Sequence, residues 1–196
     1  MRKNTTAGLA AAGGAAVIIA AAATGALLGT HSDAVAVSPT VPDEFAPYVA
    51  AGAGECETVD APLLAGVLDA TSRFDTEATG GAGQEGPAQF LPATWDVMGF
   101  DVDEDGQIID VPGTGDPRDP GDATTALARL LCTIAADQEG PRSDGTISGD
   151  RVDLVLAAHV AGEQAVLDSG GVPPYAEVRD FLTAVDTARS VHGGGQ

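Results

Sequence analysis

The sequence predicts an all-α fold, because apolar residues recur at helical spacing and strand patterns are almost lacking. Segments around Leu64, Leu127, Leu156 and Phe181 repeat apolar side chains every three or four residues, which places them on one face of a helix. Alternating apolar and polar residues are confined to short extended pieces near Ile108. With 196 residues, 44% of them hydrophobic, the chain can form one domain of ordinary size with an apolar core and an N-terminal extension.

The segment from Leu63 to Trp95 is expected to form a helix, a loop and a second, shorter helix. Asp60 can cap the first helix, and Pro62 fits its opening turn, where a backbone N–H has no intrahelical partner. Position 71, occupied by Thr71, continues the apolar stripe of this helix and is expected to face inward. The stripe comprises Leu64, Val67 and Leu68.

Three further helices are predicted in the second half of the chain. Asp122 is expected to cap a core helix, and Asp150 is expected to cap the next one. Pro173-Pro174 is expected to open the last helix, and residues 192–196 to form a disordered tail. The apolar stripe of the first of these helices comprises Ala126, Leu127, Leu130, Leu131 and Ile134.

The charge of the chain is strongly negative and unevenly distributed. Nine basic and 29 acidic residues give a formal net charge of −20, and every acidic residue follows Ser32. Such a charge disfavours binding to nucleic acid or to an anionic membrane face, and favours solubility or affinity for cations.

Residues 1–30 are predicted to be a signal peptide or an N-terminal membrane anchor. Arg2 and Lys3 precede a long uncharged run rich in Ala and Gly, and Ala34-Val35-Ala36 offers a small-x-small cleavage site. The run approaches the length needed to span a bilayer, so both interpretations stay open. Residues 31–42 are expected to be a linker, and either interpretation places the following domain outside the cytoplasm, secreted or anchored to the cell membrane and facing the cell wall.

Four blocks of sequence resemble lytic transglycosylases of the SLT type, which cut the glycan strands of peptidoglycan. The blocks are Thr71–Phe74, Gly86–Trp95, Ala158–Gly162 and Pro173–Arg179. They correspond to the family patterns Glu-Ser-x-Phe, Gly-x-x-Gln-Phe-x-Pro-x-Thr-Trp, Ala-Tyr-Asn-Ala-Gly and Pro-Pro-Tyr-Ala-Glu-x-Arg. The resemblance implies a lysozyme-like domain over residues 43–191, of the SLT and goose-type-lysozyme kind, with a glycan groove between the Leu63 helix, the Gln89 turn and the Val152 helix.

The chain departs from the family at the position of the catalytic acid. The family places its Glu where this sequence has Thr71, and an alcohol cannot protonate a leaving oxygen as a carboxylic acid does. The resemblance makes Gln89, Tyr175 and His159 the substrate-contact candidates, and the His159-Val160 pair replaces the family's Tyr-Asn. Glu85 is the fallback acid, because it is the nearest carboxylate in sequence to the turn, although a solvated loop charge is the simpler interpretation.

Cys56 and Cys132 are the only cysteines, and in an exported chain a disulfide explains them better than a metal or redox site. Two buried free thiols are the alternative. The resemblance adds weight to the pairing, because members of the family often carry cysteines at both positions.

An acidic loop from Asp101 to Asp110 contains most of a calcium-binding pattern. Acids at alternating positions are followed by a glycine, as in an EF-hand loop, but position twelve is Pro112 instead of the bidentate Glu. A solvated acidic turn is the alternative to a structural Ca²⁺ site, and no other cofactor is required. The candidate ligands are Asp101, Asp103, Asp105, Gln107 and Asp110.

Three functional hypotheses follow from these features. The first is an exported transglycosylase-like domain that engages peptidoglycan but has lost or weakened cleavage, because Thr71 replaces the acid. The second is an active lytic transglycosylase that cleaves the MurNAc-GlcNAc bond with Glu85 as a displaced acid. The third is an acidic, calcium-stabilised interaction module on the cell surface.

Overall fold

The computed structural model describes residues 40–193, which form eight helices joined by loops. The predicted signal or anchor segment and most of the linker lie outside these residues. No helix among them is both long and apolar enough to cross a bilayer. The helices are α1 (Ala46–Gly52), α2 (Ala61–Ser72), α3 (Pro92–Met98), α4 (Pro120–Asp137), α5 (Glu139–Ser143), α6 (Arg151–Ala161), α7 (Glu163–Ser169) and α8 (Ala176–Gly193).

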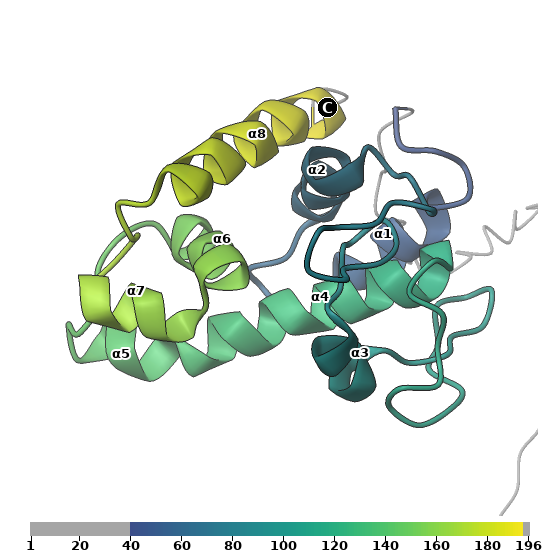
Figure 1. Cartoon of the computed structure of the whole chain (residues 1–196), viewed down its shortest axis with the longest axis horizontal. Helices are drawn as coiled ribbons and strands as arrows, with labels where there is room; N and C mark the ends of the chain where they lie inside the picture. Colours follow the sequence, from purple (N-terminus) through teal and green to yellow (C-terminus); the bar gives the residue numbers. More distant parts are fainter. Residues whose placement is uncertain (1–39, 194–196) are drawn as a thin grey trace, which may run out of the picture. The chain divides into compact units, whose positions relative to one another are not determined.

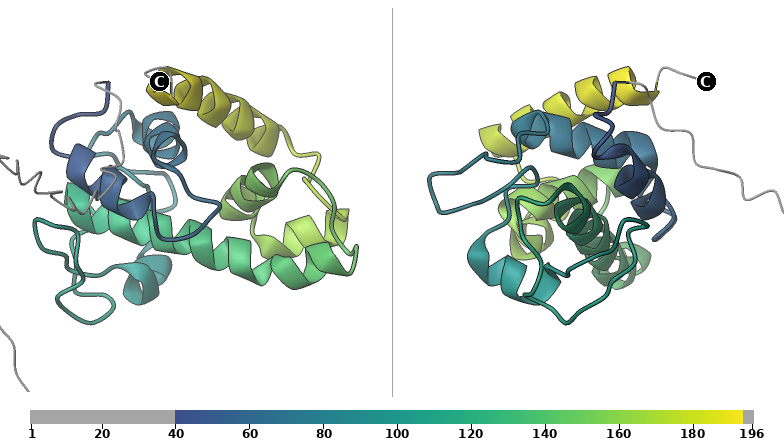
Figure 2. Two further views of the ribbon diagram at one scale, coloured as in Figure 1. Left: turned by 180° about the vertical axis from the view of Figure 1, so that it is seen from behind. Right: turned by 90° about the vertical axis from the view of Figure 1, so that its right-hand side faces the viewer.

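The described part is all-α, as predicted, and extended backbone is limited to isolated bridges. These bridges join Thr79 to Glu85, Glu85 to Phe90, and Val102 to Ile108. Figure 1 shows α4 and α8 on opposite sides of α2 and α6. The two further views in Figure 2 keep α8 alongside α2. Contacts between helices agree with this arrangement, because α8 packs against both α2 and α6, and α4 contacts them from the other side.

Helix α2 forms the centre of the core. Asp60 caps it as predicted, since its Oδ1 accepts a hydrogen bond from the Leu63 N–H at 2.8 Å. The predicted stripe is confirmed, and its three side chains are fully buried. Burial of each such aliphatic side chain stabilises the fold by about 1.5–3 kcal/mol.

A glycine sets how closely α8 approaches α2. A Cβ on Gly66 would lie 3.1 Å from the backbone nitrogen of Arg189 and 3.2 Å from the carbonyl oxygen of Val185. The atoms it would meet belong to the backbone of α8, so a side-chain rotation cannot relieve the contact. A Cβ at position 66 would therefore require the backbone of α8 to move away by a few tenths of an ångström.

The start of α4 corrects one prediction. Asp119, and not Asp122, caps this helix, because its Oδ1 accepts hydrogen bonds from the backbone N–H groups of Gly121 and Asp122. Asp122 is buried in the first turn, where its carboxylate accepts the N–H of Val102 at 2.9 Å and of Asp116 at 2.8 Å. Burial raises the pKa of the Asp122 carboxyl. Asp122 therefore ties the 101–119 loop to α4, and the predicted cap is wrong.

The ends of the domain also differ from the prediction. Val41, assigned to the linker, is buried in the core, and His192, assigned to a disordered tail, belongs to the last turn of α8 and is buried. The hydroxyl of Thr40 lies 2.8 Å from Nδ1 of His192. The described domain therefore extends beyond 43–191 at both ends, and residues 194–196 lie outside it.

Two short helices were not expected. Helix α5 follows α4 directly after Gln138, and α7 begins directly after Gly162, whose φ of 84° separates it from α6. Asp150 caps α6 as predicted, through the N–H groups of Val152 and Asp153.

The predicted disulfide is confirmed. Cys56, in the loop after α1, is bonded to Cys132 in α4, 76 positions away in the sequence, with a Cα–Cα distance of 5.9 Å. We expect the double substitution Cys56→Ser/Cys132→Ser to lower the free energy of unfolding by about 4 kcal/mol. Without the cross-link the unfolded chain gains conformational entropy, because a long loop is no longer closed. Urea denaturation measures the change. Reducing agent should destabilise the wild type to a similar extent and leave the variant unchanged, and a wild type insensitive to reduction would contradict the role of the bond.

The Gly66 contact predicts that Gly66→Ala destabilises the domain, by about 1–3 kcal/mol, even though alanine is the better helix former. Thermal unfolding measures this change. Gly140→Ala is the matched control, because Gly140 lies in α5 and a Cβ there meets no atom within 4 Å. Equal or greater stability of Gly66→Ala relative to wild type would refute the close approach of α8.

Candidate functional site

Thr71 lies in the last turn of α2, where the resemblance places a catalytic acid. The helix ends one residue later at Ser72, and Arg73 follows with a left-handed φ of 58°. The Oγ1 atom of Thr71 is enclosed and has no hydrogen-bond partner among the described residues. This position therefore holds an enclosed hydroxyl where a lytic transglycosylase has a carboxylic acid.

The turn that follows the loop depends on Gly86 and Gln89. Gly86 has a φ of 72°, and a Cβ on it would lie only 1.6 Å from the carbonyl oxygen of Pro117, so no other residue fits. Gln89 also has a positive φ, 53°, and its Nε2 donates a hydrogen bond to the Gly86 carbonyl oxygen at 2.9 Å. Part of the amide of Gln89 thus holds the turn together, in addition to any contact with a ligand.

The two aromatic residues of this segment belong to the core. Phe90 and Trp95 are both buried, and their rings meet edge to face with centroids 5.3 Å apart. The indole Nε1 of Trp95 donates a hydrogen bond to the carbonyl oxygen of Gly115 at 2.9 Å. These rings fix α3 against the domain and are not exposed as sugar platforms.

Glu85, the fallback acid, is held by an arginine from a distant loop. Its Oε2 lies 3.0 Å from the Nη1 of Arg118, whose Nε also lies 3.8 Å from Glu77. Its backbone pairs with Phe90 through hydrogen bonds of 3.0 and 3.1 Å. Glu85 thus already has an ion-pair partner, and its carboxylate would have to leave Arg118 to reach a glycosidic oxygen.

His159 and Tyr175 occupy different environments near the start of α8. The ring of His159, on the last turns of α6, lies 6.0 Å from that of Phe181 on α8, and its Nδ1 is enclosed without a hydrogen-bond partner. Burial lowers the pKa of His159 to about 4. Tyr175 precedes α8 and is 44% exposed. Among residues 40–193, no hydrogen bond or ring contact joins Thr71, Gln89, His159 and Tyr175 to one another.

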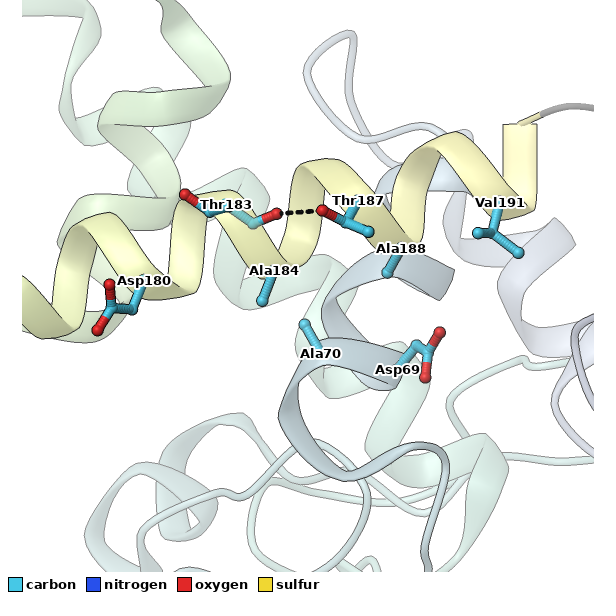
Figure 3. A pocket seen from close by; sticks show the side chains of 8 residues that line it. All are labelled: Asp69, Ala70, Asp180, Thr183, Ala184, Thr187, Ala188 and Val191. Atoms are coloured by element: carbon cyan, nitrogen blue, oxygen red, sulfur yellow. Dashed lines mark hydrogen bonds between the residues drawn. The ribbon is translucent and has the colours of Figure 1, made fainter.

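An open groove of about 500 Å³ lies between α2 and α8, and Figure 3 shows the side chains that line it. Most of the side chains that line the groove are small, and Ala70 faces Ala184 across it. Its acidic side chains are Asp69 and Asp180. A smaller hollow of about 230 Å³ lies where the start of α2 meets α6 and α8. Gln89, His159 and Tyr175, the predicted substrate residues, line neither of these two spaces. Helices α2 and α6 are not in extensive contact with each other.

Asp69 belongs to a polar cluster that sequence reasoning missed. Its Oδ2 lies 3.2 Å from Nε2 of His192, whose other ring nitrogen faces Thr40. The His192 ring also meets Phe74 edge to face, with centroids 5.7 Å apart. This cluster joins α2, α8 and the first described residues. No local signal could have revealed it, because His192 lies 123 positions from Asp69 and 152 from Thr40 in the sequence.

The proposed calcium ligands do not form a metal-binding group in the structure. Among residues 40–193, no three or more His, Cys, Asp or Glu side chains are placed so that they could hold a metal ion. In the Asp101 loop, the Oδ1 of Asp103 accepts the backbone N–H groups of Asp105 and Gln107, and Asp110 accepts that of Val111. These carboxylates thus shape the loop, and calcium binding has no support from its geometry.

No protein-family model and no solved structure matches this chain at a significant level.

The buried imidazole of His159 predicts a dependence of stability on pH. Its folded pKa of about 4 lies below the unfolded value, so between about pH 6.5 and pH 4 the unfolded state binds more protons. Stability should therefore fall as the pH drops through this window, by up to about 3 kcal/mol from this group. Urea denaturation across the window should show a smaller loss for His159→Phe than for wild type. An imidazole proton signal of His159 that titrates near pH 6.5 would contradict its burial.

Proposed function

We propose that this chain is an exported, transglycosylase-like domain that engages the glycan strands of bacterial peptidoglycan without cleaving them efficiently. The observation that carries the proposal is the enclosed hydroxyl of Thr71 at the end of α2, which has no hydrogen-bond partner within residues 40–193. Four sequence blocks resemble a lysozyme-like transglycosylase, and Thr71 stands at that family's acid position. A positioned general acid contributes about 10²–10⁴-fold to such a reaction, so its replacement by an alcohol leaves binding without efficient cleavage.

The surroundings of the Thr71 segment support this proposal in a second way. Gly86 lies so close to the Pro117 carbonyl oxygen that any Cβ would collide with it. Phe90 and Trp95 bury their rings in the core. These family-pattern residues have structural roles that are independent of catalysis. A chain that had lost cleavage would still need them to fold, which explains why the pattern persists around a missing acid.

The neighbouring carboxylates favour the non-cleaving hypothesis over an active enzyme with a displaced acid. Glu85 is paired with Arg118, and Asp69 is paired with His192. Each carboxylate therefore already has a partner, which it would have to leave in order to protonate a glycosidic oxygen.

The test uses the full chain mixed with purified peptidoglycan. Wild type should sediment with the polymer and release few or no anhydro-muropeptides. Thr71→Glu should raise their release by at least about 10²-fold, because it returns an acid to the vacated position. Thr71→Gln is the matched control, since it has nearly the size of Glu but cannot donate a proton from a carboxyl group, and it should remain inactive.

Three outcomes would overturn parts of this proposal. Failure of the wild type to sediment would remove the binding claim and favour a surface interaction module. Rapid release of anhydro-muropeptides by the wild type, abolished in Glu85→Gln, would establish the displaced acid instead. Sedimentation without any gain of cleavage in Thr71→Glu would show that the rest of the catalytic geometry is absent.

A further inference from the structure

Helix α3 and the extended segment that runs back past it carry largely exposed apolar residues. Val97 on α3, and Ile109 and Val111 on the returning segment, are 62%, 60% and 62% exposed. We call these three residues the α3 apolar patch. Single exposed apolar residues are common on proteins, but several on adjacent segments mark a surface that a partner can cover.

The two segments that carry the patch are held side by side by their backbones. The Gly113 N–H donates to the Gly99 carbonyl oxygen at 2.6 Å, and the Ile109 N–H donates to that of Asp101 at 2.9 Å. Farther along, the indole of Trp95 donates to Gly115. These contacts run in antiparallel order, so residues 95–102 and 108–115 form one arch that presents the patch.

The arch is anchored to the core, so the patch has a defined place. Asp122, buried in the first turn of α4, accepts the backbone N–H groups of Val102 and Asp116 and so holds both ends of the loop. Trp95, at the base of the arch, is buried. A surface fixed in this way can bind a partner with little cost of ordering.

The patch is set among acidic side chains, which determines the chemistry of a partner. Arg118 is already paired with Glu85, and the guanidinium of Arg129 lies over the ring of Phe100 in the same arch, 5.1 Å from the ring centroid. A formal net charge of −20 also opposes association of this face with a second copy of the same chain. The acidic residues on the two segments and the turn between them are Asp96, Asp101, Asp103, Glu104, Asp105 and Asp110.

We propose that the α3 apolar patch docks a segment of another protein in which apolar side chains alternate with lysine or arginine. The apolar side chains cover Val97, Ile109 and Val111, and the basic side chains lie against the surrounding carboxylates. Apolar burial supplies most of the affinity, and the complementary charge orients the partner and speeds its approach. This surface is independent of the proposed engagement of peptidoglycan.

The probe is a short fluorescent peptide of alternating lysine and leucine, titrated with the full chain and followed by fluorescence anisotropy. Val97→Ser/Ile109→Ser/Val111→Ser should weaken binding by about tenfold or more, because the apolar anchors are lost. Val191→Ser/Leu167→Ser is the matched control, since it removes exposed apolar side chains away from the patch and should bind as wild type. Equal thermal unfolding of the three proteins shows that the variants are folded.

Peptides of changed composition separate the contributions of charge and apolar contact. Replacing lysine by glutamate should abolish binding, and replacing leucine by glycine should weaken it as strongly as the triple substitution does. Equal binding of the leucine and glycine peptides would overturn the proposal, because only general charge attraction would then be at work. Sedimentation showing a dimer of wild type that the triple substitution dissociates would also overturn it, in favour of a second copy as the occupant.

Discussion

The close packing of α8 onto α2 is the constraint on which the rest of the structure depends. Gly66 has no Cβ, and backbone atoms of α8 lie only 3.1–3.3 Å from the position that a Cβ on this residue would occupy. With α8 on one side and α4 on the other, the α2 side chains Leu64, Val67 and Leu68 are completely buried. The end of α2 is thereby fixed, and with it Thr71, on which the proposed function rests. The same packing creates the groove that contains Asp69.

Features encoded in a few neighbouring residues could be predicted from the sequence. Asp60 and Asp150 cap their helices because a capping side chain bonds to N–H groups only two or three residues away. The apolar stripe of α2 follows from helical spacing alone. The pairing of Cys56 with Cys132 needed no geometry, since a chain with two cysteines allows only one pairing within itself.

Features that depend on distant partners could not be predicted in this way. Asp122 has the local sequence of a cap, but its carboxylate accepts hydrogen bonds from the N–H groups of Val102 and Asp116 in the preceding loop. Asp119 caps the helix instead. His192 resembles part of a polar tail until Asp69 and Thr40 are seen beside it. The pairing of Glu85 with Arg118 joins residues 33 positions apart and engages the carboxylate that was the fallback acid. Such contacts are set by tertiary packing, which periodicity does not contain.

The central claim is that the region around Thr71 holds glycan and leaves it intact. The most direct measurement follows the backbone amide signals of the isotope-labelled wild-type chain while a soluble peptidoglycan oligosaccharide is added. The account predicts changes concentrated at Thr71, Gln89 and Tyr175, with the oligosaccharide recovered at its original length. Changes confined to other parts of the domain, or conversion of the oligosaccharide to anhydro products, would contradict it.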